Sequence, residues 1–168
     1  MPLPEFAGTL GLKRAAHLLR RATFGATKAE IDQFAQLTPA QAVAQLFDQP
    51  LPEPEPPIDP STGTEWMYTG ITDANSEGFD LEQFYLAWHV GQMMSAGVPP
   101  NLSLAYSAKE KLIFFLHTHF TTIKSKVSDT RALFFQNQLF RQFVLDRDKD
   151  ETFNIKELTV KISVDNAM

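Results

Sequence analysis

The sequence predicts an all-α protein, an irregular bundle of about six to seven helices with a proline-rich linker and a helix-loop-helix at the C-terminus. Three observations predict it. Ser or Thr stands three residues before Glu ahead of apolar stretches, which is the spacing of a capping box. Apolar residues recur at helical spacing, and six of the eleven prolines gather in Gln49–Thr62. With 43% hydrophobic and 21% charged residues, the chain can bury a globular core.

Three short helices are expected in the N-terminal part. The first covers Leu12–Phe24, with Gly25 as its stop. A capping box of Thr27 with Glu30 opens the second at Lys28–Gln36. Thr38 and Pro39 open the third at Ala40–Asp48. The apolar residues expected to pack these helices together are Leu18, Leu19, Phe24, Ile31, Phe34, Val43 and Leu46.

The first of these helices is basic. It carries Lys13, Arg14, Arg20 and Arg21, and its last-turn arginines suit the negative end of the helix dipole. A solvated face is the interpretation that the sequence favours, and contact with an anion or a nucleic acid is the alternative.

The segment Gln49–Thr62 is interpreted as a stiff linker, because each proline fixes its own φ and lacks an N–H. An ordered loop is expected to follow. Asp80 with Gln83 is then expected to cap a helix at Leu81–Met94.

The central stretch, Lys109–Phe120, is expected to be a helix opened by a capping box of Ser107 with Glu110. A buried strand competes, because the stretch is rich in aromatic and β-branched residues. The choice matters for His117 and His119. On a strand both imidazoles would share a face and could bind one transition metal ion, whereas on a helix they diverge by about 200°.

A long helix is expected at Thr130–Leu145, capped by Ser128 or Asp129, and its wide apolar arc predicts burial against more than one neighbour. The residues after it follow the ligand spacing of an EF-hand calcium loop. The candidate calcium ligands are Asp146, Asp148, Asp150, Thr152, Asn154 and Glu157.

Glu151 departs from this EF-hand pattern, because it stands where the loop needs glycine in a left-handed turn. The alternative to a calcium site is an acidic, solvated turn in which Asp150 or Asn154 caps a last helix at Ile155–Asn166. Calcium is the one cofactor that the sequence suggests.

Composition limits the classes of function. A net charge of −5 argues against nucleic acid as the main partner, and the lack of cysteine removes disulfides and thiolate chemistry. No apolar run is long enough to span a bilayer. The N-terminus lacks the apolar region of a signal peptide, so the chain as given is expected to be cytoplasmic. The sequence does not assign a location beyond that expectation.

Five blocks in order resemble the N-terminal part of a bacterial family catalogued as domain of unknown function 1800. They are RAAHLLRRATFG, WHVGQMM, EKLIFFLHTHFTT, QNQLFRQFVL and ISVDNAM. The family's F-W-H-x-H-F block matches Phe115–Phe120, with Leu116 in place of tryptophan and both histidines kept. The resemblance implies a helical fold and no assigned reaction. It also implies a truncated member, since the family continues into a block resembling N-E-N-x-A-R-E-L, and its members often carry export signals.

We therefore expect one partial domain over 1–168. Its parts are a three-helix cluster (1–48), a linker and ordered loop (49–79) and an aromatic-rich helical core (80–168). A structural or interaction domain without catalysis of its own, with a protein partner not identified, is the first hypothesis. A calcium-binding helical module is the second. The third is part of a metal-dependent enzyme that uses His117 or His119 with residues missing from this chain.

Overall fold

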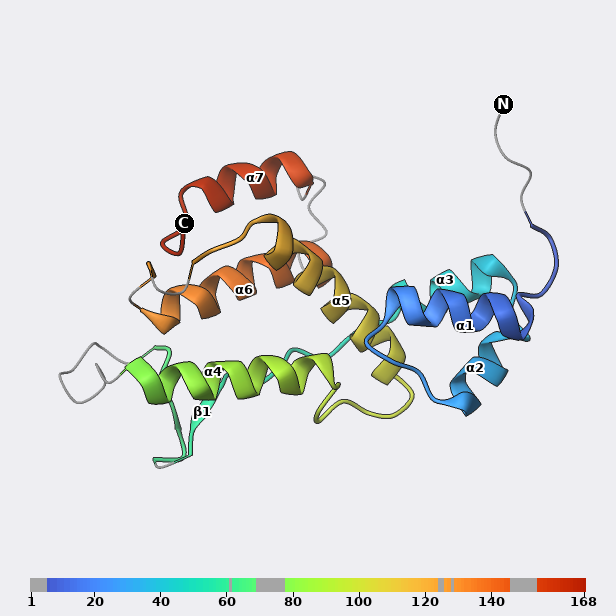
Figure 1. Cartoon of the computed structure of the whole chain (residues 1–168), viewed down its shortest axis with the longest axis horizontal. Coiled ribbons are helices and arrows are strands. Elements are labelled where there is room, and N and C mark those ends of the chain that lie inside the picture. The colour runs from blue at the N-terminus through green and yellow to red at the C-terminus, as the bar shows by residue number, and fades with distance from the viewer. Residues whose placement is uncertain (1–5, 61, 69–77, 124–125, 128, 146–153) are drawn as a thin grey trace. The chain divides into compact units, whose positions relative to one another are not determined.

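The computed structural model describes residues 6–60, 62–68, 78–123, 126–127, 129–145 and 154–168. It confirms a mostly helical fold. Seven helices and one short strand pair follow in the order α1 (Gly11–Ala22), α2 (Lys28–Phe34), α3 (Pro39–Phe47), β1 (Ile58–Asp59), β2 (Thr64–Glu65), α4 (Gly78–Met93), α5 (Ser103–His119), α6 (Thr130–Leu145) and α7 (Ile155–Ser163) (Figure 1). None of the helices among these residues is both long and apolar enough to cross a membrane.

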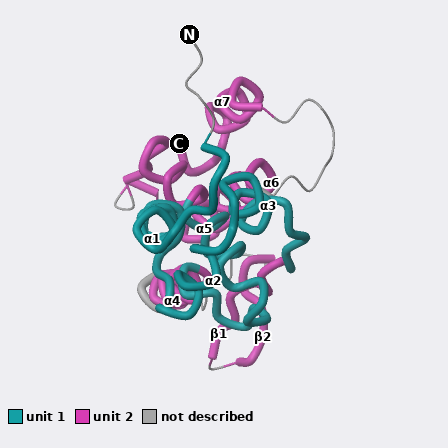
Figure 2. The backbone as a smooth tube through the Cα atoms, turned by 90° about the vertical axis from the view of Figure 1, so that its right-hand side faces the viewer, with its two compact units in different colours: residues 1–52, 93–111 teal, residues 53–92, 112–168 magenta. Residues whose placement is uncertain are grey.

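The chain divides into two compact units, coloured separately in Figure 2. Unit 1 contains Met1–Pro52 and Met93–Lys111, and unit 2 contains Glu53–Gln92 and Leu112–Met168. The helix α5 is continuous across the division, so each unit receives one part of it.

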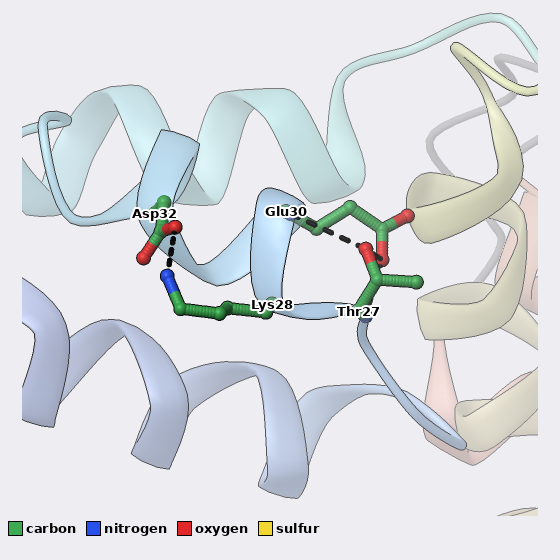
Figure 3. A network of polar contacts seen from close by, with 4 residues as sticks. All are labelled: Thr27, Lys28, Glu30 and Asp32. Carbon is green, nitrogen blue, oxygen red and sulfur yellow. Dashed lines mark hydrogen bonds and ion pairs between the residues drawn. The ribbon is translucent and has the colours of Figure 1, made fainter.

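Unit 1 is built as its caps predict. The side chain of Thr27 accepts from the backbone N–H of Glu30 at 3.3 Å, and the Glu30 carboxylate accepts from the Thr27 backbone N–H at 2.6 Å (Figure 3). Thr38 and Gln41 form the same reciprocal pair at the start of α3. These bonds satisfy orphan N–H groups at both helix starts, which is why α2 and α3 begin where the sequence places them.

The core of unit 1 includes Leu19, Phe34 and Leu46, all fully buried, as expected. The expectation that Val43 and Phe24 also belong to this core is wrong. Val43 is 49% exposed because α3 turns its Ala42 and Leu46 face inward, four residues apart. Phe24 is 37% exposed because α1 already ends at Ala22.

The expected capping box at the start of α5 is also wrong. The helix begins at Ser103, so Ser107 and Glu110 lie in its interior. The Ser107 hydroxyl instead accepts from the backbone N–H of Phe24 at 3.0 Å, a tertiary bond that local spacing does not reveal. The helical prediction for this stretch is confirmed, however, and the competing strand is wrong.

The starts of α4 and α6 differ in how well they follow the sequence. The helix α4 begins at Gly78, so the expected start at Leu81, after Asp80, is wrong. Asp129 does cap α6, since its carboxylate accepts from the backbone N–H of Arg131 at 2.9 Å. The strand pair Ile58–Asp59 with Thr64–Glu65 was not predicted from the sequence.

In unit 2, α6 lies between α4 and α7 (Figure 1) and has an apolar cluster on each side. Toward α4, Phe134 packs with buried Tyr85 and half-buried Trp88. Toward α5 and α7, Phe140 packs with Ile113, Leu158 and Ile162. The wide apolar arc of α6 is therefore buried against several neighbours, as its sequence predicts.

Candidate functional site

A buried polar cluster lies where α4, α5 and α6 meet in unit 2. We call it the histidine–asparagine cluster, and it consists of His89 from α4, His117 from α5, and Asn137 and Arg141 from α6. Asn137 and Arg141 are four residues apart and so share one face of α6. Both are fully buried, at 0% exposure, and each histidine is partly buried.

The hydrogen bonds in this cluster run in one direction. Arg141 Nε donates to Asn137 Oδ1 at 2.7 Å. Because a guanidinium has no acceptor, this bond fixes which end of the amide is the oxygen. The amide nitrogen Nδ2 then faces His89 Nδ1 at 3.2 Å and His117 Nε2 at 2.9 Å. An amide nitrogen only donates, so both imidazole nitrogens are acceptors without a proton.

This proton arrangement fixes both histidine tautomers. A neutral imidazole carries its proton on the nitrogen that is not accepting. His89 therefore holds its proton on Nε2, and His117 holds its proton on Nδ1. Asn137, oriented by Arg141, therefore sets the tautomers of two histidines that belong to two other helices.

Aromatic rings enclose the cluster. The rings of His89 and His117 stand nearly perpendicular, with centroids 5.5 Å apart. The rings of His117 and Phe140 also stand nearly perpendicular, with centroids 4.7 Å apart. The Arg141 guanidinium carbon lies 5.3 Å from the ring centre of Trp88, within cation–π range. These contacts limit access of water to the hydrogen bonds.

Burial and charge keep both imidazoles neutral. Burial, with a smaller contribution from the Arg141 charge, lowers the pKa of His89 to about 4. Burial also lowers the pKa of His117, to about 3, assisted by His89 and then by Arg141. Burial raises the pKa of nearby Tyr85 above its usual value, against a smaller lowering by Arg141. At pH 7 the cluster therefore contains one charge, on Arg141, and two neutral acceptors.

The structure brings His117 together with His89 and separates it from His119. His119 is exposed, its Nδ1 lies 3.0 Å from the carbonyl oxygen of Phe115, and its ring lies 3.9 Å from the Phe115 ring. The divergence expected for a helix is thus observed. Within the described part of the chain, no three His, Asp or Glu side chains gather closely enough to hold a metal ion.

The expected calcium ligands fall mostly outside the described residues, including Asp146, Asp148, Asp150 and Thr152. Asn154 and Glu157 are described. The Asn154 side chain accepts from the backbone N–H of Glu157 at 3.1 Å and so caps α7, and a Glu157 carboxylate oxygen lies 4.0 Å from Lys161 Nζ. Asn154 thus has the capping role that the sequence offers as one alternative.

Sequence reasoning missed three of the four cluster members. These three are His89 of α4 and the polar residues Asn137 and Arg141 of α6. A usable signal was present, because polar residues inside an arc that must pack on several neighbours have to be buried as well.

The structure defines a mostly helical fold in which α4, α5 and α6 of unit 2 meet around a buried, oriented polar network. The chain belongs to the family described as protein of unknown function (DUF1800), whose model matches residues 17–168. No curated protein matches the sequence, and no solved structure matches it.

Proposed function

We propose that this chain is a structural domain in which the histidine–asparagine cluster fixes the packing of α4, α5 and α6. The observation that carries the proposal is that the amide of Asn137 bonds to three side chains. One comes from α4, one from α5 and one from α6, the helix of Asn137 itself. A buried polar group without its partner costs about 1–3 kcal/mol, so only one arrangement of these helices satisfies all four side chains.

The low pKa values support a structural role over acid–base catalysis by the cluster. A general acid or base works best with a pKa near the working pH. His89 at about 4 and His117 at about 3 both lie well below 7. At neutral pH they serve as fixed hydrogen-bond acceptors and do not exchange protons with a reactant.

Replacement of Asn137 tests this proposal. Asn137→Ala removes the acceptor of Arg141 Nε and the donor to both histidines, and we expect it to lower the free energy of unfolding by about 3–5 kcal/mol. The matched control is Gln142→Ala, which removes an exposed amide from the same helix and should change stability by less than about 0.5 kcal/mol. Urea unfolding followed by circular dichroism measures both, and equal stabilities would refute the proposal.

A second candidate function is calcium binding by the loop of residues 146–157. The helical frame favours it, since α6 ends at Leu145 and α7 begins at Ile155, which places the acidic residues between two helices. Glu157 lies in the first turn of α7, at the position from which an EF-hand glutamate binds its ion.

Thermal unfolding in chelator and in millimolar calcium tests this candidate. Calcium at about 100 times its dissociation constant should stabilise the fold by about 2.7 kcal/mol. Glu157→Gln keeps the backbone N–H that Asn154 accepts from and removes the charge, so it should abolish the gain. Equal melting temperatures with and without calcium in the unmodified chain would contradict calcium binding.

A further inference from the structure

The helix α1 presents one continuous basic face. At 100° per residue, Lys13, Arg14, His17, Arg20 and Arg21 fall within an arc of about 120°, spread over about 12 Å of helix. All five are exposed. The opposite face carries Ala15 and Leu19, which are fully buried in the core of unit 1, so packing holds the basic face outward.

The four cations on this face are not neutralised within the described part of the chain. The helix contains no acidic residue, and its lysine and three arginines form no ion pair with the described carboxylates. All 20 acidic residues and 11 of the 15 basic ones lie elsewhere in the chain. The helix is therefore purely basic, while acidic residues outnumber basic ones in the rest of the chain. A concentrated positive face on an acidic chain favours an anionic partner that contacts this face alone.

A groove along the same face indicates the kind of anion. Its volume is about 1010 Å³, and besides the five basic residues it is lined by Ala16 and Leu18. The surface that lines it is mainly apolar, as expected where the long stems of lysine and arginine side chains are exposed. Phe6, 47% exposed and 4.3 Å from the Arg14 guanidinium carbon, and Leu12, 60% exposed, add apolar surface near one end.

We propose that the basic face of α1 is a docking surface for anionic phospholipids at a membrane surface. Cationic ends on apolar stems, with exposed Phe6 and Leu12 beside them, match a surface that combines negative headgroups with an apolar interior, whereas a nucleic acid duplex presents phosphates with no apolar layer behind them. Because the apolar face of α1 is buried in the core, the helix lies on the membrane without inserting that face. Attraction of lysine and arginine to the anionic leaflet then supplies the binding, which is sensitive to salt.

Vesicle co-sedimentation of the full chain tests the proposal, with phosphatidylcholine vesicles compared with vesicles that contain about 30% phosphatidylserine. We expect binding to the anionic vesicles only, and its loss between about 100 and 500 mM salt. Lys13→Gln with Arg20→Gln should weaken binding roughly 30-fold, at about 1 kcal/mol for each cation removed. The matched control is Lys126→Gln with Lys156→Gln, which removes two exposed charges from unit 2 and should bind within about twofold of the unmodified chain.

Three results would overturn the proposal. One is no binding to anionic vesicles at about 100 mM salt. Another is an equal loss in both double variants, which would attribute binding to net charge and not to this face. The third is binding of polyglutamate or duplex DNA with vesicles left unbound, which would assign the face to an acidic protein or a nucleic acid. Circular dichroism of each variant checks that the exposed substitutions leave the fold intact.

Discussion

Acidification from pH 7 to pH 5 is expected to lower the free energy of unfolding by about 4 kcal/mol through His89 and His117 alone. In the folded chain their pKa values are about 4 and about 3, below the ordinary histidine value of 6.5. The unfolded chain therefore takes up nearly two protons near pH 5.5 that the folded chain does not bind. Each histidine contributes about 2 kcal/mol of this loss at pH 5.

The sign follows from the direction of the shifts. Both folded-state pKa values are lowered, so the stabilising contribution is complete above about pH 6.5 and is lost progressively as the pH falls toward 4 and 3. A total unfolding free energy of about 5–15 kcal/mol is usual for a domain, so a loss of this size is measurable.

Urea unfolding at pH 7, 6 and 5 measures the effect. The control is His89→Gln with His117→Gln, whose amide oxygens can accept from Asn137 without titrating. Carboxylates elsewhere titrate equally in both proteins, so the difference between the two pH profiles isolates the histidines. The unmodified chain should lose about 4 kcal/mol more than the double variant. Parallel profiles would refute the reasoning that the histidines are buried and neutral.

Four further substitutions, each measured by urea unfolding, test the structure of unit 1. Leu19→Ala should cost about 2–5 kcal/mol because its side chain is fully buried, whereas Val43→Ala, at a half-exposed position, should cost less than about 1 kcal/mol. A large cost for Val43→Ala would contradict the register of α3, and a small cost for Leu19→Ala would contradict the burial of that side chain of α1. Thr38→Ala should cost about 1 kcal/mol through loss of its capping box, and an unchanged stability would show that the cap is dispensable. Ser107→Ala should cost about 1–3 kcal/mol by leaving the backbone N–H of Phe24 without its acceptor, and a neutral effect would argue against that bond.

Local signals predicted unit 1 well where the relevant contacts are local. Capping boxes at Thr27 and Thr38 join residues three apart, and both form as their spacing indicates. The same spacing failed at Ser107, because a helix that has already begun at Ser103 has no orphan N–H groups there to cap. The spacing of a capping box therefore predicts a helix start only where the residues before it are not already helical.

Hydrophobic spacing was less informative for α4. Leu86 and Val90 are 46% and 51% exposed, while the face carrying Tyr85 and Trp88 packs toward α6. Aromatic side chains bury more area than aliphatic ones, so they decide which face turns inward even when each carries a polar group. Trp88 places that group by donating its Nε1–H to the carbonyl oxygen of Glu55 at 2.7 Å.

The candidate site was only partly predictable for a related reason. His117 was selected from the sequence because a second histidine stands two residues away, but helical geometry directs His119 outward. Its real neighbours, His89 and Asn137, are 28 and 20 residues away along the chain. The arc of α6 indicates that its polar residues are buried, but contacts between helices at such separations leave no periodic trace in a single sequence, so only the fold reveals which residues meet.

The measurement that tests the histidine–asparagine cluster most directly is the side-chain nitrogen NMR spectrum of the two buried histidines at pH 7. His89→Gln assigns the signals by removing one set. We expect two neutral rings in opposite tautomers, with the proton of His89 on Nε2 and that of His117 on Nδ1. A protonated ring, or the same tautomer in both, would contradict an asparagine amide oriented by Arg141 and donating to both imidazoles.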